Sequence, residues 1–273
     1  MVQKLLWICH TNRPSPSTNY LIGKPFGKIF DRTCWLPLSF GVLYLLKTTG
    51  LVSAKRLGIE WRHCGLWLRF FAFGAILSLA ICATQLVATQ WTFKGEFVTS
   101  ILTKAFGSAL LVSFLEEIVF RGLIPCLISN AAGAVFALVL SSAFFAYVHF
   151  KIPADVGNFY GASIDIAKSA AVGLAYLTGI RSTFQLIPYF SLFALSGLLL
   201  MLVYRFANLM ASMGFHCGLI FVLLLYRKLI CFTTDPLEFL GSNHLIDSPL
   251  ALILLCALFF YQCGQYFRRR ARA

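Results

Sequence analysis

The chain alternates between long apolar runs and short polar connections over most of its length. Two runs, 34–52 and 168–180, are weaker than the others, because the first carries Pro37 and Lys47 and the second is short. Since a helix that crosses a bilayer needs about 20 mostly apolar residues, the pattern predicts an all-α polytopic membrane protein. We expect a single bundle of seven or eight transmembrane helices, without internal repeats. The stronger candidate helices lie at about 66–88, 101–128, 133–150, 184–204, 206–226 and 249–267.

Composition supports a membrane protein. Of the 273 residues, 59% are apolar or aromatic and only 12% are charged, whereas about 25% of the residues in an ordinary soluble domain are charged. A soluble fold of this size would leave too much apolar surface in contact with water. The composition therefore excludes a soluble enzyme, a disordered chain and a nucleic-acid-binding module.

Positive charge gathers at both ends of the chain, which has a net charge of +13. Residues 1–33 contain five Lys or Arg and residues 268–273 contain four Arg. By the positive-inside rule, we expect a cytoplasmic N-terminal segment at 1–33, a transmembrane bundle at 34–267 and a basic cytoplasmic tail at 268–273. The basic flanks and the lack of a transit peptide favour a multi-pass protein of the bacterial inner membrane.

If eight spans are counted from a cytoplasmic N-terminus, each connection between spans is assigned to the inside or the outside of the membrane. This count puts 89–100 and 151–167 inside, and 129–132 and 229–248 outside. The last of these connections contains acidic residues and no Lys or Arg, which fits an outer loop.

The candidate helix at 101–128 carries three ionisable residues within six positions, Glu116, Glu117 and Arg121. One charged residue at the centre of a membrane helix costs at least about 2.5–3.5 kcal/mol. Glu117 and Arg121 are four residues apart, so they share a helix face and are able to pair. Glu116 points about 100° away from Glu117. A structural ion pair therefore leaves Glu116 unexplained, which favours a functional site.

His149 ends the next apolar run. Measured from the connection expected at 129–132, Glu116 lies 13 residues before it and His149 lies 17 residues after it. Two antiparallel helices would then place these side chains at depths that agree to about 6 Å. We expect Glu116 and His149 to meet in one cavity.

A polar stripe marks the run at 206–226, where Asn208, Ser212 and His216 follow one another at a spacing of four. Asn208 and Ser212 are typical of hydrogen bonds between membrane helices. His216, near the middle of the run, is the third candidate functional residue.

One glutamate and two histidines around a wet cavity suit two chemistries. In the first, Glu116 and His149 bind and deprotonate a water that attacks a peptide carbonyl, and His216 stabilises the oxyanion. In the second, the three side chains bind Zn²⁺. The spacing of the residues leaves both open.

At these positions the sequence resembles the CPBP intramembrane protease family, which includes the CaaX prenyl endopeptidases and bacteriocin-processing homologues. Its motif EExxxR matches Glu116, Glu117 and Arg121, and FxxxH matches Phe145 and His149. A third motif, HxxxN, starts at His216, and the resemblance covers about residues 100–225.

The resemblance implies a membrane endopeptidase that uses a glutamate-activated water and needs no metal or other cofactor. Glu116 would be the base, His149 its partner on the water and His216 an oxyanion donor, while Glu117 and Arg121 would hold the geometry. The chain departs from the family at Ile220, where HxxxN has its Asn. Ser212, Asn208 or a backbone amide would replace that donor, or catalysis would be weak.

The expected partners are the lipid bilayer and a membrane-associated peptide substrate, either prenylated or a precursor peptide, and not a nucleic acid. Two alternatives remain. One is an inactive pseudo-protease or scaffold, favoured by Ile220. The other is a proton-coupled transporter in which Glu116, His149 and His216 relay protons.

Overall fold

The computed structural model describes residues 59–94, 98–149, 186–233, 238–240 and 248–271, with a few single positions between 40 and 50. All the helices and strands named below belong to the compact unit formed by residues 45–150 and 182–273. The other unit, residues 1–44 and 151–181, contains only a few described positions. The predicted span at 168–180 and most of the one at 34–52 therefore lie outside the described residues.

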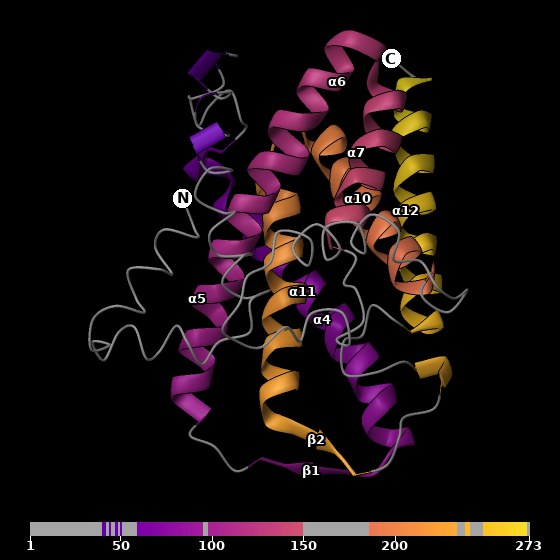
Figure 1. Ribbon diagram of the computed structural model, residues 1–273. Coiled ribbons are helices and arrows are strands. Elements are labelled where there is room, and N and C mark those ends of the chain that lie inside the picture. Colours follow the sequence, from indigo (N-terminus) through magenta and orange to yellow (C-terminus); the bar gives the residue numbers. More distant parts are fainter. Residues whose placement is uncertain are drawn as a thin grey trace, which may run out of the picture. The chain divides into compact units, whose positions relative to one another are not determined.

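Each of the six strong apolar runs folds as a helix (Figure 1). The short 3₁₀-helix η1 (Trp61–His63) leads into α4, and the 3₁₀-helix η4 (Glu238–Leu240) precedes α12. A continuous helical segment is built from α5, the π-helix η2 and α6. The bounds are α4 Cys64–Ala88, α5 Val98–Glu117, η2 Ile118–Leu123, α6 Ile124–Ala132, α7 Ala134–His149, α10 Leu186–Phe206, α11 Met210–Leu229 and α12 Pro249–Arg270.

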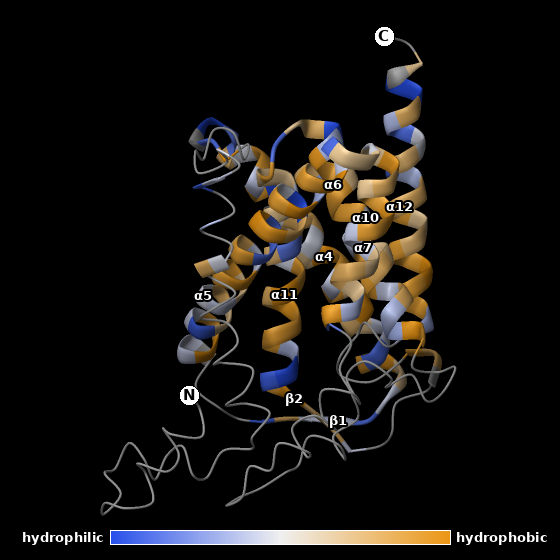
Figure 2. Ribbon diagram, turned by 45° about the horizontal axis from the view of Figure 1, so that its top comes forward, coloured by the Kyte–Doolittle hydropathy of each residue, from blue (hydrophilic) through white to orange (hydrophobic). Residues whose placement is uncertain are grey.

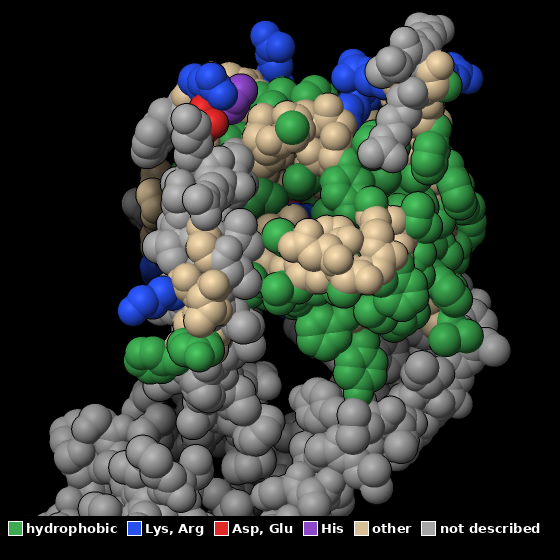
Figure 3. Space-filling view, turned by 90° about the horizontal axis from the view of Figure 1, so that it is seen from above, with side chains coloured by type: hydrophobic (Ala, Val, Ile, Leu, Met, Phe, Trp, Pro, Cys, Tyr) green, Lys and Arg blue, Asp and Glu red, His purple; other side chains and the backbone are tan. Residues whose placement is uncertain are grey.

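Four of the described helices, α4, α10, α11 and α12, are long and apolar enough to cross a membrane. Helix α7 is also apolar but has 16 residues. Apolar residues run along most of these helices (Figure 2), and hydrophobic side chains cover much of the face in Figure 3, with Lys and Arg at its edge. The chain is an all-α membrane protein, and the count of seven or eight spans stays a prediction.

Glycines bring α4 and α11 into backbone contact. A Cβ atom at Gly214 would collide with the carbonyl of Trp67, and one at Gly218 would collide with the carbonyl of Phe71. The two glycines are four residues apart, the small-xxx-small spacing that lets membrane helices approach closely. Since both contacts advance together along the two chains, α4 and α11 run in the same direction.

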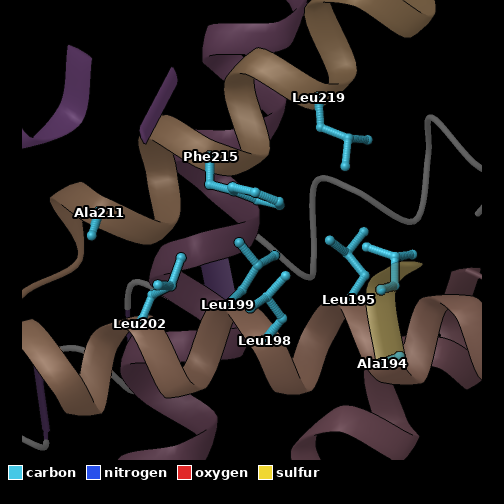
Figure 4. Close-up of a cluster of buried hydrophobic side chains, with 9 residues drawn as sticks. Ala194, Leu195, Leu198, Leu199, Leu202, Ala211, Phe215 and Leu219 are labelled. Atoms are coloured by element: carbon cyan, nitrogen blue, oxygen red, sulfur yellow. The ribbon is translucent and has the colours of Figure 1, made fainter. Parts of the chain in front are cut away.

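Helix α10 packs on another face of α11. Leu195, Leu198, Leu199 and Leu202 form a buried cluster with Ala211, Phe215 and Leu219 (Figure 4). The turn at Ala207–Leu209 connects the two helices, so they are antiparallel. Helix α11 is thus fixed between α4 and α10.

A small sheet closes one end of the bundle. Strand β1 (Trp91–Phe93) pairs in antiparallel register with β2 (Ile230–Phe232), with Thr92 opposite Cys231. The strands follow directly on α4 and α11, so both helices end on the same side of the membrane (Figure 1). The assignment of 89–100 to the inside and of 229–248 to the outside is therefore wrong, because the pairing puts parts of both connections at the same end of the bundle.

The turn between α6 and α7 is shorter than expected. Helix α6 continues to Ala132, and Gly133 alone makes the turn, with a φ of 86° that suits glycine. The connection predicted at 129–132 is wrong, because Ser129 stays helical and its hydroxyl donates to the carbonyl of Cys126 at 3.2 Å.

Candidate active site

Glu116 and Glu117 are the last residues of α5, and Arg121 lies in η2, where the helix widens to a π-turn. Pro125, in the first turn of α6, explains the loosened helix. It has no N–H to donate to the carbonyl four residues earlier, that of Arg121, and its ring would clash with this carbonyl. Single π-turns of this kind recur at functional sites.

Arg121 and Glu117 form a buried ion pair. The Nη1 atom of Arg121 lies 3.2 Å from Oε1 of Glu117, and both side chains are completely buried. The guanidinium also lies over the ring of Phe145, 4.2 Å from its centroid. Among the described residues, its nitrogens have no hydrogen-bond partner, so this buried charge is balanced by Glu117 and by the aromatic face.

His216, on α11, contacts the carboxylates of both Glu117 and Glu116. Its Nδ1 atom lies 2.8 Å from Oε1 of Glu117, the oxygen that Arg121 also approaches. Its Nε2 atom lies 3.8 Å from Oε2 of Glu116. His216 is the seventh residue of α11, and the backbone contact with α4 at Gly214 and Gly218 fixes the helix on either side of it.

His149 completes the cluster from the end of α7. Its Nε2 atom lies 3.2 Å from Oε1 of Glu116. Its Nδ1 atom lies 2.8 Å from the carbonyl of Phe145, and because a carbonyl only accepts hydrogen bonds, Nδ1 carries the hydrogen. The expectation that Glu116 and His149 meet is confirmed. Counted from the true turn at Gly133, they lie 17 residues before it and 16 after it, which matches their depths more closely than the predicted connection did.

Exposure falls steadily across the cluster. The side chain of His149 is 29% exposed and that of Glu116 11%, whereas His216 is 4% exposed and Glu117 is fully buried. Within the described part of the chain, Glu116 is therefore more open on the side of His149, whereas Glu117 and Arg121 are the most deeply buried residues of the cluster.

Asn208 and Ser212 are occupied by local hydrogen bonds. Asn208 precedes α11, where its Oδ1 accepts the N–H of Met210 at 3.0 Å and its Nδ2 donates to Phe206 at 3.3 Å. The hydroxyl of Ser212 donates to the carbonyl of Leu209 at 3.1 Å. Both residues therefore stabilise the start of α11. Ile220 is half-buried, one turn beyond His216.

In the described part of the chain no group of three His, Cys, Asp or Glu side chains is arranged to hold a metal ion, and the zinc alternative stays untested. Glu116, His149 and His216 approach one another pairwise, through the two oxygens of one carboxylate.

One residue of the site, Phe120, was not predicted from the sequence. Phe120 packs edge-on against Phe145, with ring centroids 5.1 Å apart, and also contacts His149 at 5.9 Å. The glycines at 214 and 218, which fix the position of His216, carried a recognisable signal in their spacing of four.

Among the described residues, two glutamates, an arginine and two histidines from α5, η2, α7 and α11 gather around one carboxylate, as the resemblance to intramembrane proteases leads one to expect. Comparison with known families agrees. Residues 98–222 match the family model Rce1-like, described as Type II CAAX prenyl endopeptidase Rce1-like. The resemblance seen in the three motifs is confirmed over this segment, which contains all of Glu116, His149 and His216. Comparison with curated proteins and with solved structures gives no match.

Proposed function

We propose that this protein is an intramembrane endopeptidase in which Glu116 activates a water molecule. One observation carries the proposal: the Nε2 atoms of His149 and His216, from two different helices, face the two oxygens of the same glutamate. A carboxylate held between two imidazoles suits general base catalysis on water. His149 is able to hold the water together with Glu116, and His216 is able to bind the oxyanion that forms.

The reaction begins with a water held between Glu116 and the Nε2 atom of His149. Glu116 takes one proton as the water oxygen attacks the carbonyl carbon of the scissile peptide bond. The resulting oxyanion lies against His216. Glu116 then gives its proton to the departing amine as the C–N bond breaks, which leaves a carboxylic acid and an amine and returns the enzyme to its starting state. The acid then loses its remaining proton to the surrounding water. No metal or other cofactor takes part.

The substrate we propose is a peptide that reaches the site from the membrane or its surface. The name of the matched family points to prenylated C-terminal peptides, and a precursor peptide without a lipid is the other class to test. We further propose that the protein lies in a bacterial inner membrane with both termini in the cytoplasm. In that orientation the sheet of β1 and β2, at the opposite end of α12 from Arg268–Arg270, is outside.

Cleavage in proteoliposomes tests the proposal. Quenched peptides, with and without a farnesylated cysteine, are compared for wild type, Glu116→Ala and His149→Ala, each with and without a zinc chelator. We expect wild-type cleavage that survives the chelator and falls by about 10²–10⁴-fold in both variants. Cleavage that Glu116→Ala retains, or that the chelator abolishes and zinc restores, contradicts the mechanism.

Ile220 favours a second candidate, a pseudo-protease that binds a membrane partner without cleaving it. A folded wild type that cleaves none of the peptides supports this candidate.

A further inference from the structure

The last turn of α10 carries an arginine, Arg205, that the chemistry above does not use. Helices α10 and α12 run in the same direction, because Gly197 lies against the ring of Phe259 and, further along both helices, the rings of Tyr204 and Tyr266 are 6.1 Å apart. Their last turns therefore meet at the end of the bundle opposite the β-sheet.

The guanidinium of Arg205 has only neutral neighbours on these two helices. Its Nη1 atom donates to Oε1 of Gln262 at 2.7 Å, and its central carbon lies 5.3 Å from the centroid of the Phe206 ring. Its Nε atom is buried and has no hydrogen-bond partner among the described residues. A guanidinium has five N–H donors, so its hydrogen bonding is far from complete here.

The positive charge of Arg205 is also unbalanced in the described part of the chain. Neither α10 nor α12 contains an Asp or Glu, and the ion pairs among the described residues do not include Arg205. The C-terminal end of α10 supplies only about half a negative charge. A half-buried cation without a counter-charge is costly, which points to an anion from outside the chain.

A second arginine extends the same positive region along α12. Arg269 lies seven residues after Gln262, so it is on the same face of the helix and about 10 Å further along the axis. Its side chain is exposed. Arginine suits phosphate, because its planar group of donors matches two phosphate oxygens at once.

This end of the bundle has the character of a membrane surface. Tyr204 and Tyr266 are of the residue type that gathers at the level of the lipid headgroups. Hydrophilic residues mark the last turns of α12 (Figure 2). The phosphates of the lipids lie at the same level.

We propose that Arg205 and Arg269, between the last turns of α10 and α12, bind the phosphate of an anionic phospholipid. Basic positions between membrane helices are suited to such headgroups. The phosphate supplies the negative charge that both helices lack. It reaches Arg205 because that side chain is half-buried, and Arg269 binds it from the side of the water. The inference does not depend on the peptidase mechanism.

Thermal unfolding of the full-length protein, freed of lipid in detergent, tests the proposal. Phosphatidylglycerol is compared with phosphatidylcholine, which has no net charge, and with inorganic phosphate. At ten times its Kd, we expect phosphatidylglycerol to raise the unfolding temperature by about 3–6 °C. Phosphatidylcholine and inorganic phosphate should give much smaller shifts. Native mass spectrometry counts the bound lipid.

Variants assign the effect to the two arginines. Arg205→Gln should lose most of the shift, and Arg269→Gln, an exposed position that leaves the packing unchanged, should raise the Kd about fivefold. The matched control is Arg69→Gln, which should keep the full shift. Arg69 is an exposed arginine of α4 at the same end of the bundle, since its neighbour Phe70 contacts Phe206.

Each of the other outcomes overturns the proposal. An equal shift with phosphatidylcholine would show that the headgroup charge does not matter, and an equal shift with inorganic phosphate would show that the ligand is not a lipid. Arg205→Gln that keeps the full shift would place the lipid elsewhere. Equal losses in Arg69→Gln and Arg205→Gln would mean that the lipid responds only to the overall charge of this end.

Discussion

The ring of Phe145 stacks on the imidazole of His149, with centroids 4.1 Å apart and planes inclined by 29°. The same phenylalanine accepts the Nδ1 hydrogen of His149 through its carbonyl. The ring of Phe145 also lies against the guanidinium of Arg121. One side chain, 1% exposed, therefore contacts both the imidazole that faces Glu116 and the buried guanidinium of Arg121.

Replacing the ring of Phe145 by another apolar side chain tests whether ring stacking orients His149. Phe145→Leu keeps an apolar side chain but loses the stacking, worth about 0.5–1.5 kcal/mol. If this energy is needed to hold His149 in the transition state, kcat falls by about two- to tenfold. Steady-state cleavage kinetics measure the effect, and Phe136→Leu, on an exposed part of α7, is the matched control. Equal rates for both variants would show that stacking does not position His149.

Arg121→Met should destabilise the protein strongly. It leaves Glu117 without its cation in a completely buried position, which costs about 3–5 kcal/mol. Thermal unfolding in detergent should show a large loss for Arg121→Met and a smaller loss when Glu117→Gln is added. Equal losses in the two variants would mean that the pair is not coupled.

Gly218→Ala tests the contact between α4 and α11. The new methyl group would collide with the carbonyl of Phe71, and such overpacking costs about 1–3 kcal/mol. Because α11 carries His216, we expect reduced cleavage together with a lower unfolding temperature. Gly107→Ala is the control, since a Cβ there meets nothing within 4 Å in the described part of the chain, and alanine favours a helix. Equal unfolding temperatures for the two variants would contradict the close crossing.

Thr92→Cys tests the sheet. Thr92 lies opposite Cys231 in the antiparallel pair, where Cα atoms are about 5.5 Å apart, within the range that a disulfide spans. Under mild oxidation we expect a disulfide, detected by mass spectrometry and abolished by Cys231→Ser. Its absence, with labelling of the two cysteines from opposite sides of a vesicle, would contradict the pairing and restore the assignment of 89–100 and 229–248 to opposite sides of the membrane.

Most helices of this fold could be predicted from the sequence, because a helix that crosses a bilayer needs a long apolar run. The bounds of α4, for example, differ from the prediction by two residues at one end and agree at Ala88. The polar cluster could be predicted for a related reason. Glu116, Glu117 and Arg121 stand out in an apolar run, and helix geometry relates their depth to that of His149.

Pairings between distant segments could not be predicted from the sequence. Strands β1 and β2 have three residues each and are separated by more than a hundred positions, so periodicity gives no signal for their pairing. Without that pairing, the sides of the membrane were assigned from a count of spans. Asn208 was misplaced on the helix of His216 for a local reason, because spacing alone does not distinguish a helix face from a residue of the turn before it, whose side chain accepts a hydrogen bond from the first turn of the helix.

The charges of α5 and η2 also bear on how the chain enters the membrane. Glu116, Glu117 and Arg121 are neighbours on one segment, but their third partner, His216, lies almost a hundred residues later in the chain. During synthesis, α5 is made well before α11, so its carboxylates would meet lipid without that partner, at about 2.5–3.5 kcal/mol for each charged residue at the bilayer centre. We expect the segment from α5 to α7 to enter the bilayer fully only after α11 has been made, because His216 then becomes available as a partner. The residues proposed to perform the chemistry would thus also constrain the order in which the bundle is assembled.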